Sequence, residues 1–126
     1  MRKESVLIID DDKIARDSLE TLLEIEGFDV RCCDSGPSAV ELLQTMSFDI
    51  IFTDYRMPHM NGDEVVKLLR YHYPDIYIIG MSIADMGTAF YMAGADAFID
   101  KQRLVSELST LLDARKLADG EKKITW

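Results

Sequence analysis

The sequence predicts an α/β protein, built as a doubly wound sheet of five parallel strands with helices on both faces. Short apolar runs alternate strictly with amphipathic stretches along the 126 residues. The runs are apolar throughout, which indicates strands that are covered on both faces of a parallel sheet. No internal linker or low-complexity segment interrupts the alternation. The chain is therefore expected to form one domain, at residues 1–117, followed by a polar tail at 118–126.

The chain opens with a strand and a helix. Residues 6–9 are an uninterrupted apolar run, which is typical of a buried strand. Residues 14–26 have one apolar face, which predicts a helix, and Gly27 is placed to end it. The inner face of this helix is assigned to Ile14, Leu19, Leu22 and Leu23.

The middle of the chain repeats this unit. Residues 28–33 are the second strand, and Pro37 suits the first turn of the helix that begins at Gly36. That helix is expected to face inward through Ala39, Val40, Leu43 and Met46. Residues 50–53 are the third strand, and a loop with Pro58, Asn61 and Gly62 follows it.

The last part of the chain adds three helices and two strands. The first is a helix that carries Val65, Val66, Leu69 and Tyr73 and that Pro74 ends. A strand at 76–81, a helix near 85–93, a strand at 97–99 and a helix at 104–117 follow. By intrinsic propensity the helix at 85–93 is the weakest of the chain.

Charge and composition exclude several classes of protein. The net charge of −9 repels nucleic acid, so DNA binding by this chain alone is not expected. No apolar run approaches the roughly 20 residues that cross a bilayer, and the start lacks a signal-peptide core. These features predict a cytoplasmic protein without membrane contact. A disulfide between the adjacent Cys32 and Cys33 would be strained, so two reduced thiols are expected.

Polar residues follow the strands at the edge where an open α/β sheet binds its ligands. They are Asp10, Asp11 and Asp12 after the first strand, Asp54 after the third, Ser82 after the fourth and Lys101 after the fifth. Carboxylates that share one crevice raise each other's pKa unless a cation separates them. Carboxylates and waters are the ligands that Mg²⁺ prefers, whereas His59 and His72 do not form a ligand pair by spacing.

A magnesium ion beside an ammonium group and a hydroxyl is suited to a phosphoryl group, whose charge lies on three oxygens. The metal, Lys101 and Ser82 can each hold one of them. The nucleophile is then a carboxylate, because an aspartate can form an acyl phosphate. Asp54 is the best candidate, since it ends a central strand.

Taken in order, these motifs resemble the receiver domain of two-component response regulators. The similarity covers about residues 4–117, and its most specific pieces are residues 7–12, 53–62, 80–82 and 94–101. The resemblance implies a flavodoxin-like (βα)5 fold with strand order 2-1-3-4-5. It also implies that Asp54 is the phosphoacceptor. Asp11 and Asp54 would ligate Mg²⁺ directly, with the backbone carbonyl of Arg56 as a third ligand and Asp10 acting through a water.

The resemblance also assigns the remaining roles. Lys101 would pair with the phosphoryl group, Ser82 would move to bond it, and the ring of Phe98 would follow that movement. The donor would be phosphohistidine on a histidine kinase or a histidine phosphotransfer protein. The output would be altered binding of a downstream effector. Such a domain takes part in its own phosphorylation and dephosphorylation and is not a turnover enzyme.

Three departures from the family pattern stand out. Gln102 follows Lys101 where the family usually has a proline after a cis bond, so a trans bond and a different loop are expected here. Phe98 lacks the hydroxyl of the common tyrosine. Arg56 and Ala84 occupy positions that tune the loss of the phosphoryl group, which leaves its lifetime open.

Other interpretations stay open at this point. Residues 8–12 also resemble the motif of haloacid-dehalogenase-type phosphatases, with Asp10 as nucleophile and Asp12 as general acid and base; a non-phosphorylated binding module is a second alternative. Asp12 is mainly expected to cap a helix, and Ser82 could cap the helix at 85–93.

The output face is a further hypothesis. It combines the segment 82–94 with the fifth strand and the last helix, and it treats the segment as mobile. Its methionines, Met81, Met86 and Met92, are equally well explained as core filling. The sequence does not name the kinase, the effector or the pathway, and it leaves open a homodimer and a longer parent protein.

Overall fold

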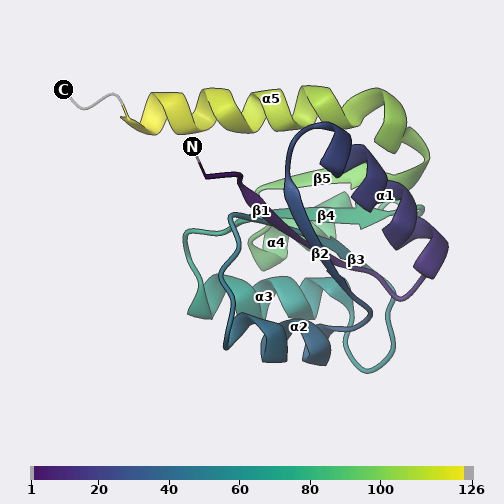
Figure 1. Ribbon diagram of the computed structural model, residues 1–126. Helices are drawn as coiled ribbons and strands as arrows, with labels where there is room; N and C mark the ends of the chain where they lie inside the picture. The colour runs from purple at the N-terminus through teal and green to yellow at the C-terminus, as the bar shows by residue number, and fades with distance from the viewer. Residues whose placement is uncertain (1, 124–126) are drawn as a thin grey trace.

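The computed structural model describes the backbone of residues 2–123 and the side chains of residues 2–117. Its elements are β1 (Ser5–Ile9), α1 (Lys13–Ile25), β2 (Asp29–Cys33), α2 (Gly36–Leu43), β3 (Ile50–Asp54), α3 (Gly62–His72), β4 (Tyr77–Ser82), α4 (Gly87–Ala93), β5 (Ala97–Asp100), the 3-10 turn η1 (Lys101–Arg103) and α5 (Leu104–Lys123). The predicted alternation of strands and helices is confirmed (Figure 1).

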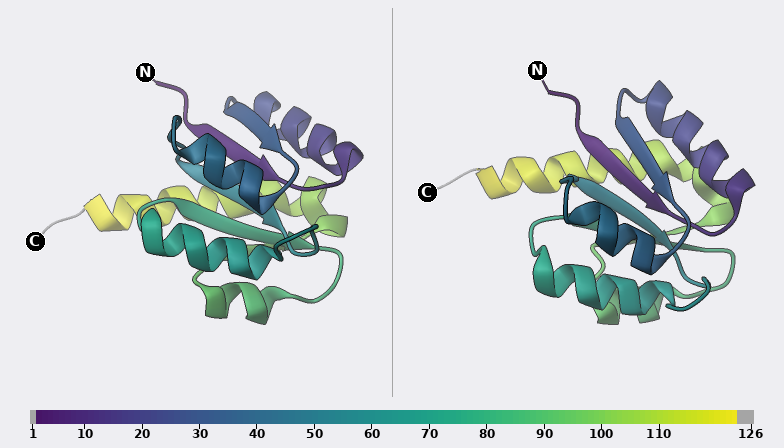
Figure 2. Two further views of the ribbon diagram at one scale, coloured as in Figure 1. Left: turned by 90° about the horizontal axis from the view of Figure 1, so that it is seen from below. Right: turned by 60° about the horizontal axis from the view of Figure 1, so that its bottom comes forward.

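The five strands form one parallel sheet in the order β2-β1-β3-β4-β5. Helices cover both faces, with α1 and α5 on one side and α2, α3 and α4 on the other (Figures 1 and 2). The central strands β1 and β3 are buried almost throughout, whereas the edge strand β2 is only partly buried. The predicted fold class and strand order are therefore confirmed.

Alternate residues of each strand supply two separate cores. Leu7, Ile51 and Ile78 face α2, α3 and α4, and Val6 and Ile8 face α1 and α5. Because successive side chains point to opposite faces of a strand, an unbroken apolar run serves both cores at once.

Helix α1 lies within one residue of its predicted bounds at each end, but one inner residue was wrongly assigned. Asp12 caps the helix by accepting the backbone N–H of Ile14, and Gly27 follows its end with a positive φ of 96°. Leu19 and Leu23 are buried, whereas Ile14 is 77% exposed. At about 100° per residue, Ile14 lies on the side of the helix opposite Leu23.

Three boundaries also differ from the predictions. Helix α2 ends at Leu43, so Met46, which was assigned to its inner face, lies beyond the helix. Helix α4 begins at Gly87 and not at Asp85, and its N-cap residue Met86 makes no side-chain capping bond. Helix α5 was expected to end at Leu117 but continues to Lys123, since residues 118–123 contain no proline. Its last turns extend beyond the sheet (Figure 2). The rest of the predicted tail, residues 124–126, lies outside the described residues.

Candidate functional site

The polar residues that follow the strands converge at the carboxyl edge of the sheet. Asp54, Ser82 and Asp100 are the last residues of β3, β4 and β5. Asp10 comes directly after β1, and Lys101 directly after β5. Because all five strands are parallel, these residues meet at one edge.

Lys101 joins two of the carboxylates. Its Nζ lies 2.6 Å from Oδ2 of Asp10 and 3.1 Å from Oδ1 of Asp54. The Lys101 side chain is 16% exposed and that of Asp10 only 1%. This is a largely desolvated ion pair, in which removal of one partner would leave the other charge uncompensated.

Asp10, Asp11 and Asp54 each direct one carboxylate oxygen into a common space. These oxygens lie within 4.8 Å of one another. Asp10 is buried, Asp54 is 9% exposed, and Asp11 is exposed to solvent. The donor set is entirely oxygen and opens to water on one side, which fits a hard divalent cation that keeps part of its hydration shell.

The electrostatics of the site disfavour the ionised form of Asp54. Burial raises the pKa of Asp54 and the charge of Asp10 raises it further, while the ammonium group of Lys101 offsets this only in part. Burial lowers the pKa of Lys101, but its hydrogen bond and charge attraction to Asp10, together with Asp54, raise it above the ordinary value. Asp10 and Asp54 therefore share a single ammonium group, and a second cation would relieve the repulsion among the carboxylates.

The β1–α1 loop is held by its own polar groups. The backbone N–H of Asp12 donates to Oδ1 of Asp10 at 3.0 Å, and Nη1 of Arg16 donates to the carbonyl of Asp10 at 2.7 Å. The backbone N–H of Asp10 donates to the backbone carbonyl of Cys33 at 3.1 Å. The sequence analysis missed Arg16. Its place in the first turns of α1, close after the acidic residues, was the available signal.

Gly62 gives the β3–α3 loop a close approach that was also missed. Its N–H donates to the carbonyl of Tyr55 at 2.6 Å. A Cβ atom at Gly62 would lie 2.1 Å from the carbonyl oxygen of Asp54, so no larger residue fits without a backbone shift. The start of α3 thus packs directly on the backbone of Asp54. The sequence analysis treated Gly62 only as a loop residue.

Ser82 lies at this edge but caps no helix. It is 5% exposed, and its Oγ accepts the backbone N–H of Ala84 at 3.1 Å. The N-cap of α4 is Met86, which makes no side-chain capping bond. The alternative of Ser82 as a cap of α4 is therefore wrong, because the helix begins five residues later.

Aromatic rings connect the β3–α3 loop to β5. Phe90 of α4 is fully buried, with its ring 5.6 Å from that of Tyr55 and 5.9 Å from that of Phe98. Phe98 is half-buried. A Cβ atom at Gly80 would meet the Phe90 ring at 2.3 Å, so glycine makes the room for this ring.

The other predictions have simple outcomes. The described residues contain no cis peptide bond, so Lys101–Gln102 is trans as expected. Cys32 and Cys33 are free thiols.

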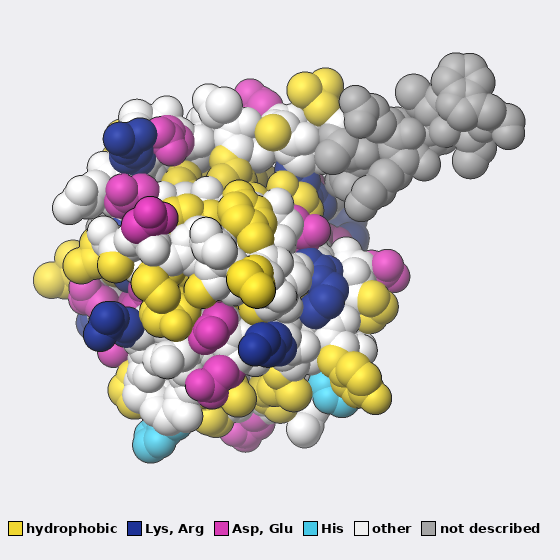
Figure 3. All heavy atoms as spheres, turned by 180° about the vertical axis from the view of Figure 1, so that it is seen from behind, with side chains coloured by type: hydrophobic (Ala, Val, Ile, Leu, Met, Phe, Trp, Pro, Cys, Tyr) yellow, Lys and Arg dark blue, Asp and Glu magenta, His cyan; other side chains and the backbone are white. Residues whose placement is uncertain are grey.

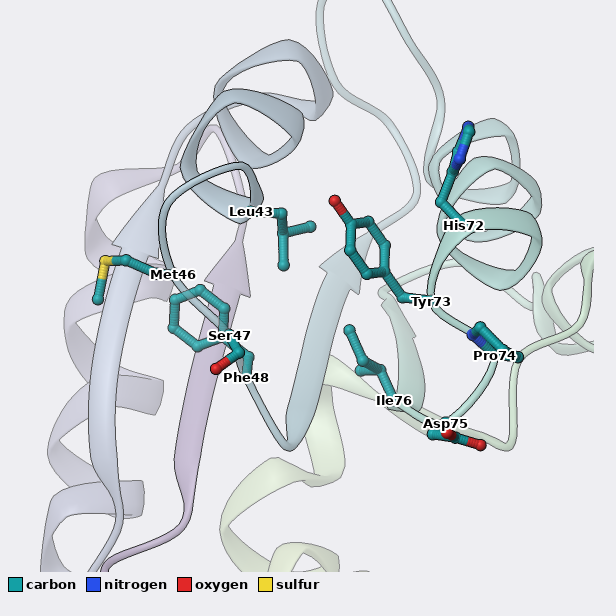
Figure 4. Close-up of a pocket in the computed structure, with 9 residues that line it drawn as sticks. All are labelled: Leu43, Met46, Ser47, Phe48, His72, Tyr73, Pro74, Asp75 and Ile76. Atoms are coloured by element: carbon teal, nitrogen blue, oxygen red, sulfur yellow. The ribbon is translucent and has the colours of Figure 1, made fainter.

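The two histidines lie far from one another. His59 lies in the β3–α3 loop, whereas His72 lines an apolar hollow of about 330 Å³ at the opposite end of the sheet (Figure 4). Met81 is core and Met92 is 83% exposed.

The family of this chain follows from its sequence match together with this geometry. Residues 6–113 match the family model described as the response regulator receiver domain. The chain belongs to this family. It is 31% identical over 123 residues to the response regulator MprA of Mycobacterium ulcerans, which covers 92% of this chain and 53% of that protein. With the cell cycle transcriptional regulator CtrA of Caulobacter vibrioides it shares 32% identity over 99 residues, covering 76% of this chain and 43% of the relative.

Solved receiver domains have the same fold. The response regulator TrrA of Thermotoga maritima, in complex with Mg²⁺ and BeF, has a TM-score of 0.81 at 23% identity and covers 88% of this chain and 97% of its own. The receiver domain of the histidine kinase CKI1 from Arabidopsis thaliana has a TM-score of 0.76 at 28% identity, with 91% of each chain covered. This receiver chain spans about half the length of the curated relatives it matches.

The family match establishes the general role of the domain. A receiver domain is the phosphorylation switch of two-component signal transduction and not a classical enzyme. Neither the haloacid-dehalogenase-type phosphatase nor the non-phosphorylated module receives support from these relatives. Among the residues that the structure describes, no helix is both long and apolar enough to span a membrane.

Proposed function

We propose that this receiver accepts a phosphoryl group on Asp54 from phosphohistidine, carried by a histidine kinase or a histidine phosphotransfer protein. The observation that carries the proposal is the position of the Asp54 carboxylate. It ends a central strand at 9% exposure, 3.1 Å from Nζ of Lys101 and beside Asp10 and Asp11. A nucleophile, a cation and an oxygen-rich metal site are thereby gathered in one crevice.

Asp11 and Asp54 would hold Mg²⁺ directly, with the backbone carbonyl of Arg56 as a third ligand and Asp10 acting through a water. The close oxygens of the three aspartates support this assignment. When bound, Mg²⁺ neutralises negative charge on the phosphoryl oxygens and on the carboxylates around them. A bound cation would oppose the burial and the Asp10 charge, which both raise the pKa of Asp54.

The reaction needs few groups of this chain. A carboxylate oxygen of Asp54 attacks phosphorus, an oxygen–phosphorus bond forms, and the phosphorus–nitrogen bond to the donor imidazole breaks with its electron pair left on nitrogen. Lys101 is close enough to exchange its contact with Asp54 for one with a phosphoryl oxygen. The ion pair of Lys101 with Asp10 keeps the ammonium group in the crevice during this exchange.

Phosphorylation adds about −1.5 to −2 charge at one point, and this charge biases the conformation. We assign the response to Ser82 and Phe98. The Ser82 hydroxyl carries its own hydrogen, which is free to reorient toward a phosphoryl oxygen while its contact with Ala84 changes. Phe98 contacts the buried ring of Phe90 on α4, so a shift of α4 would change the environment of Phe98.

The surface of α4 with β5 and α5 is proposed as the effector face. Ile83 is 73% exposed, Tyr91 54% and Met92 83%, so apolar side chains are available for a partner. Figure 3 shows such side chains among charged ones on the side away from the viewer in Figure 1. Helix α4 is short and lacks a side-chain cap, which is consistent with mobility. Protection of residues 82–94 equal to that of α1 in hydrogen exchange, unchanged by phosphorylation, would contradict this assignment.

Further features of the proposal concern the whole chain. We propose a cytoplasmic receiver of residues 1–117 with a C-terminal segment at 118–126, and no direct binding of nucleic acid by this chain.

The test is incubation with Mg²⁺ and acetyl phosphate or phosphoramidate, followed by intact mass. The wild type should gain one phosphoryl group, and Asp54→Asn should gain none. Asp49→Asn, at the other end of β3, is the matched control and should react like the wild type. Reaction of Asp54→Asn, with the acyl phosphate mapped to Asp10, would overturn the proposal in favour of the phosphatase mechanism.

A further inference from the structure

The backbone that carries Lys101 lies outside the sheet. The β4–β5 pairing ends with Ser82 opposite Asp100, so Lys101 is the first residue beyond the ladder. It belongs to η1, a single 3-10 turn of residues Lys101–Arg103. Yet its ammonium group must meet two carboxylates within 2.6 and 3.1 Å. Some other contact has to fix where this side chain leaves the backbone.

Asp100 makes that contact. Its Oδ1 accepts the backbone N–H of Gln102 at 2.9 Å, which closes a turn around Lys101. Such an Asx turn fixes the backbone of the residue between acceptor and donor. Gln102 can take part because it has an N–H, which a proline at this position would lack. The bond thus depends on the residue at which this chain departs from the family pattern.

We propose that Asp100 is a positioning residue for Lys101, acting through the N–H of Gln102. Among the described residues, the Asp100 carboxylate has the Gln102 N–H as its hydrogen-bond partner, and the proposal rests on the function assigned above to Asp54 and Lys101. Without the turn, Lys101 would reach Asp10 and Asp54 from a less restricted backbone. The phosphoryl transfer would slow while the acidic metal site stayed intact.

Two pairs of variants separate the hydrogen bond from other effects. Asp100→Ala removes the acceptor, whereas Asp100→Asn keeps a side-chain oxygen at the same place. Gln102→Pro removes the donor, whereas Gln102→Ala keeps it. The phosphorylation rate with acetyl phosphate should fall roughly 5-fold in Asp100→Ala and in Gln102→Pro, the scale of one lost capping bond. It should stay within about twofold of the wild type in the two matched controls.

A second readout distinguishes positioning from loss of structure. The Mg²⁺ concentration that half-saturates the rise in melting temperature should be unchanged in Asp100→Ala, because Asp10, Asp11 and Asp54 are retained. In the wild type, the Gln102 amide should also exchange slowly with deuterium. A rapidly exchanging Gln102 amide, an unchanged rate in Asp100→Ala, or an equal loss in Asp100→Asn would each overturn the proposal. Failure of the wild type to accept a phosphoryl group would instead refute the function assigned to Asp54.

Discussion

Strand β3 has an aspartate at each end, and the two carboxylates have opposite environments. Asp49 precedes the strand and accepts the backbone N–H of Ser5 at 2.8 Å and Nη2 of Arg2 at 3.0 Å. Burial acts to raise the pKa of Asp49, but these donors outweigh it and the pKa is lowered. Asp54 ends the strand, and there burial and Asp10 raise the pKa despite Lys101. One carboxylate is stabilised as an ion, and the other is held as an ion at a cost to stability.

The buried cations at the two ends of the sheet differ in the same way. Arg115 of α5 pairs with both carboxylate oxygens of Glu4, at 2.9 and 2.6 Å, and its guanidinium group lies 5.7 Å from the ring centroid of Tyr77. Glu4 is 38% exposed. Lys101 instead neutralises Asp10, which has almost no access to water. Ion pairs at the amino end therefore resemble ordinary structural contacts, while those at the carboxyl end leave charge that a ligand can use.

Removing each cation should have unequal effects, and this is the largest expected difference. Lys101→Met leaves the buried Asp10 carboxylate without a cation, which should lower the free energy of unfolding by about 3 kcal/mol in the absence of Mg²⁺. Arg115→Met leaves Glu4 able to reach water, so the free energy of unfolding should fall less in this variant than in Lys101→Met. Urea denaturation of both variants measures the difference. An equal fall in the free energy of unfolding of both variants would mean that the two ends of the sheet do not differ as described.

The stabilisation of the fold by Mg²⁺ should depend on the acids at the carboxyl end of the sheet and not on those at the amino end. Mg²⁺ at about 100 times its Kd should raise the free energy of unfolding by about 2.7 kcal/mol. Asp11→Asn removes a proposed ligand and should require more Mg²⁺ for the same rise in melting temperature. Asp29→Asn, an exposed acid at the amino end of β2, is the matched control. A Mg²⁺ response that Asp11→Asn leaves unaltered would exclude Asp11 as a ligand.

The two aspartates that flank β3, Asp49 before it and Asp54 at its end, should give stability profiles of opposite sign. The lowered pKa of Asp49 stabilises the fold above the unfolded pKa, and this contribution is lost as pH falls through the folded pKa. Asp49→Asn should therefore be less stable at pH 7 and approach the wild type in acid.

The raised pKa of Asp54 means that its ionisation destabilises the fold as pH rises from the unfolded pKa through the folded pKa. Without Mg²⁺, Asp54→Asn should be more stable than the wild type at pH 7, with the advantage fading in acid. Thermal melts between about pH 3 and pH 7 measure both profiles. A destabilised Asp54→Asn at pH 7 would show that its contact with Lys101 outweighs burial and Asp10.

The last prediction concerns the reactivity of the two cysteine thiols at the end of β2, where the smallest effect is expected. Burial, together with the hydrogen bond and charge of Glu20, raises the pKa of Cys32 to about 12. Burial raises the pKa of Cys33 to about 11. At pH 8 only roughly one Cys33 in a thousand is a thiolate, so a thiol reagent should label the native chain very slowly. Labelling should become fast in urea, and fast labelling without urea would contradict these environments.

Local signals in the sequence predict most of the fold. Val6 to Ile9, Asp12 and Gly27 form a strand, an N-cap and a helix end through contacts with near neighbours in the chain. The errors occur where an element ends without such a signal. Helix α4 has no cap that would mark its start, and α5 has no proline that would mark its end.

The functional site likewise has features that local sequence predicts and features that only the tertiary structure shows. The sequence alone determined which residue types stand after each strand, and parallel strands bring those positions to one edge. Only the tertiary structure decided that Lys101 meets Asp10 more closely than Asp54, that Gly62 packs on the Asp54 carbonyl, and that Asp100 holds the Gln102 N–H. Strand and cap propensities act over a few residues, whereas these contacts depend on how separate segments meet in space, and no short stretch of sequence encodes that meeting.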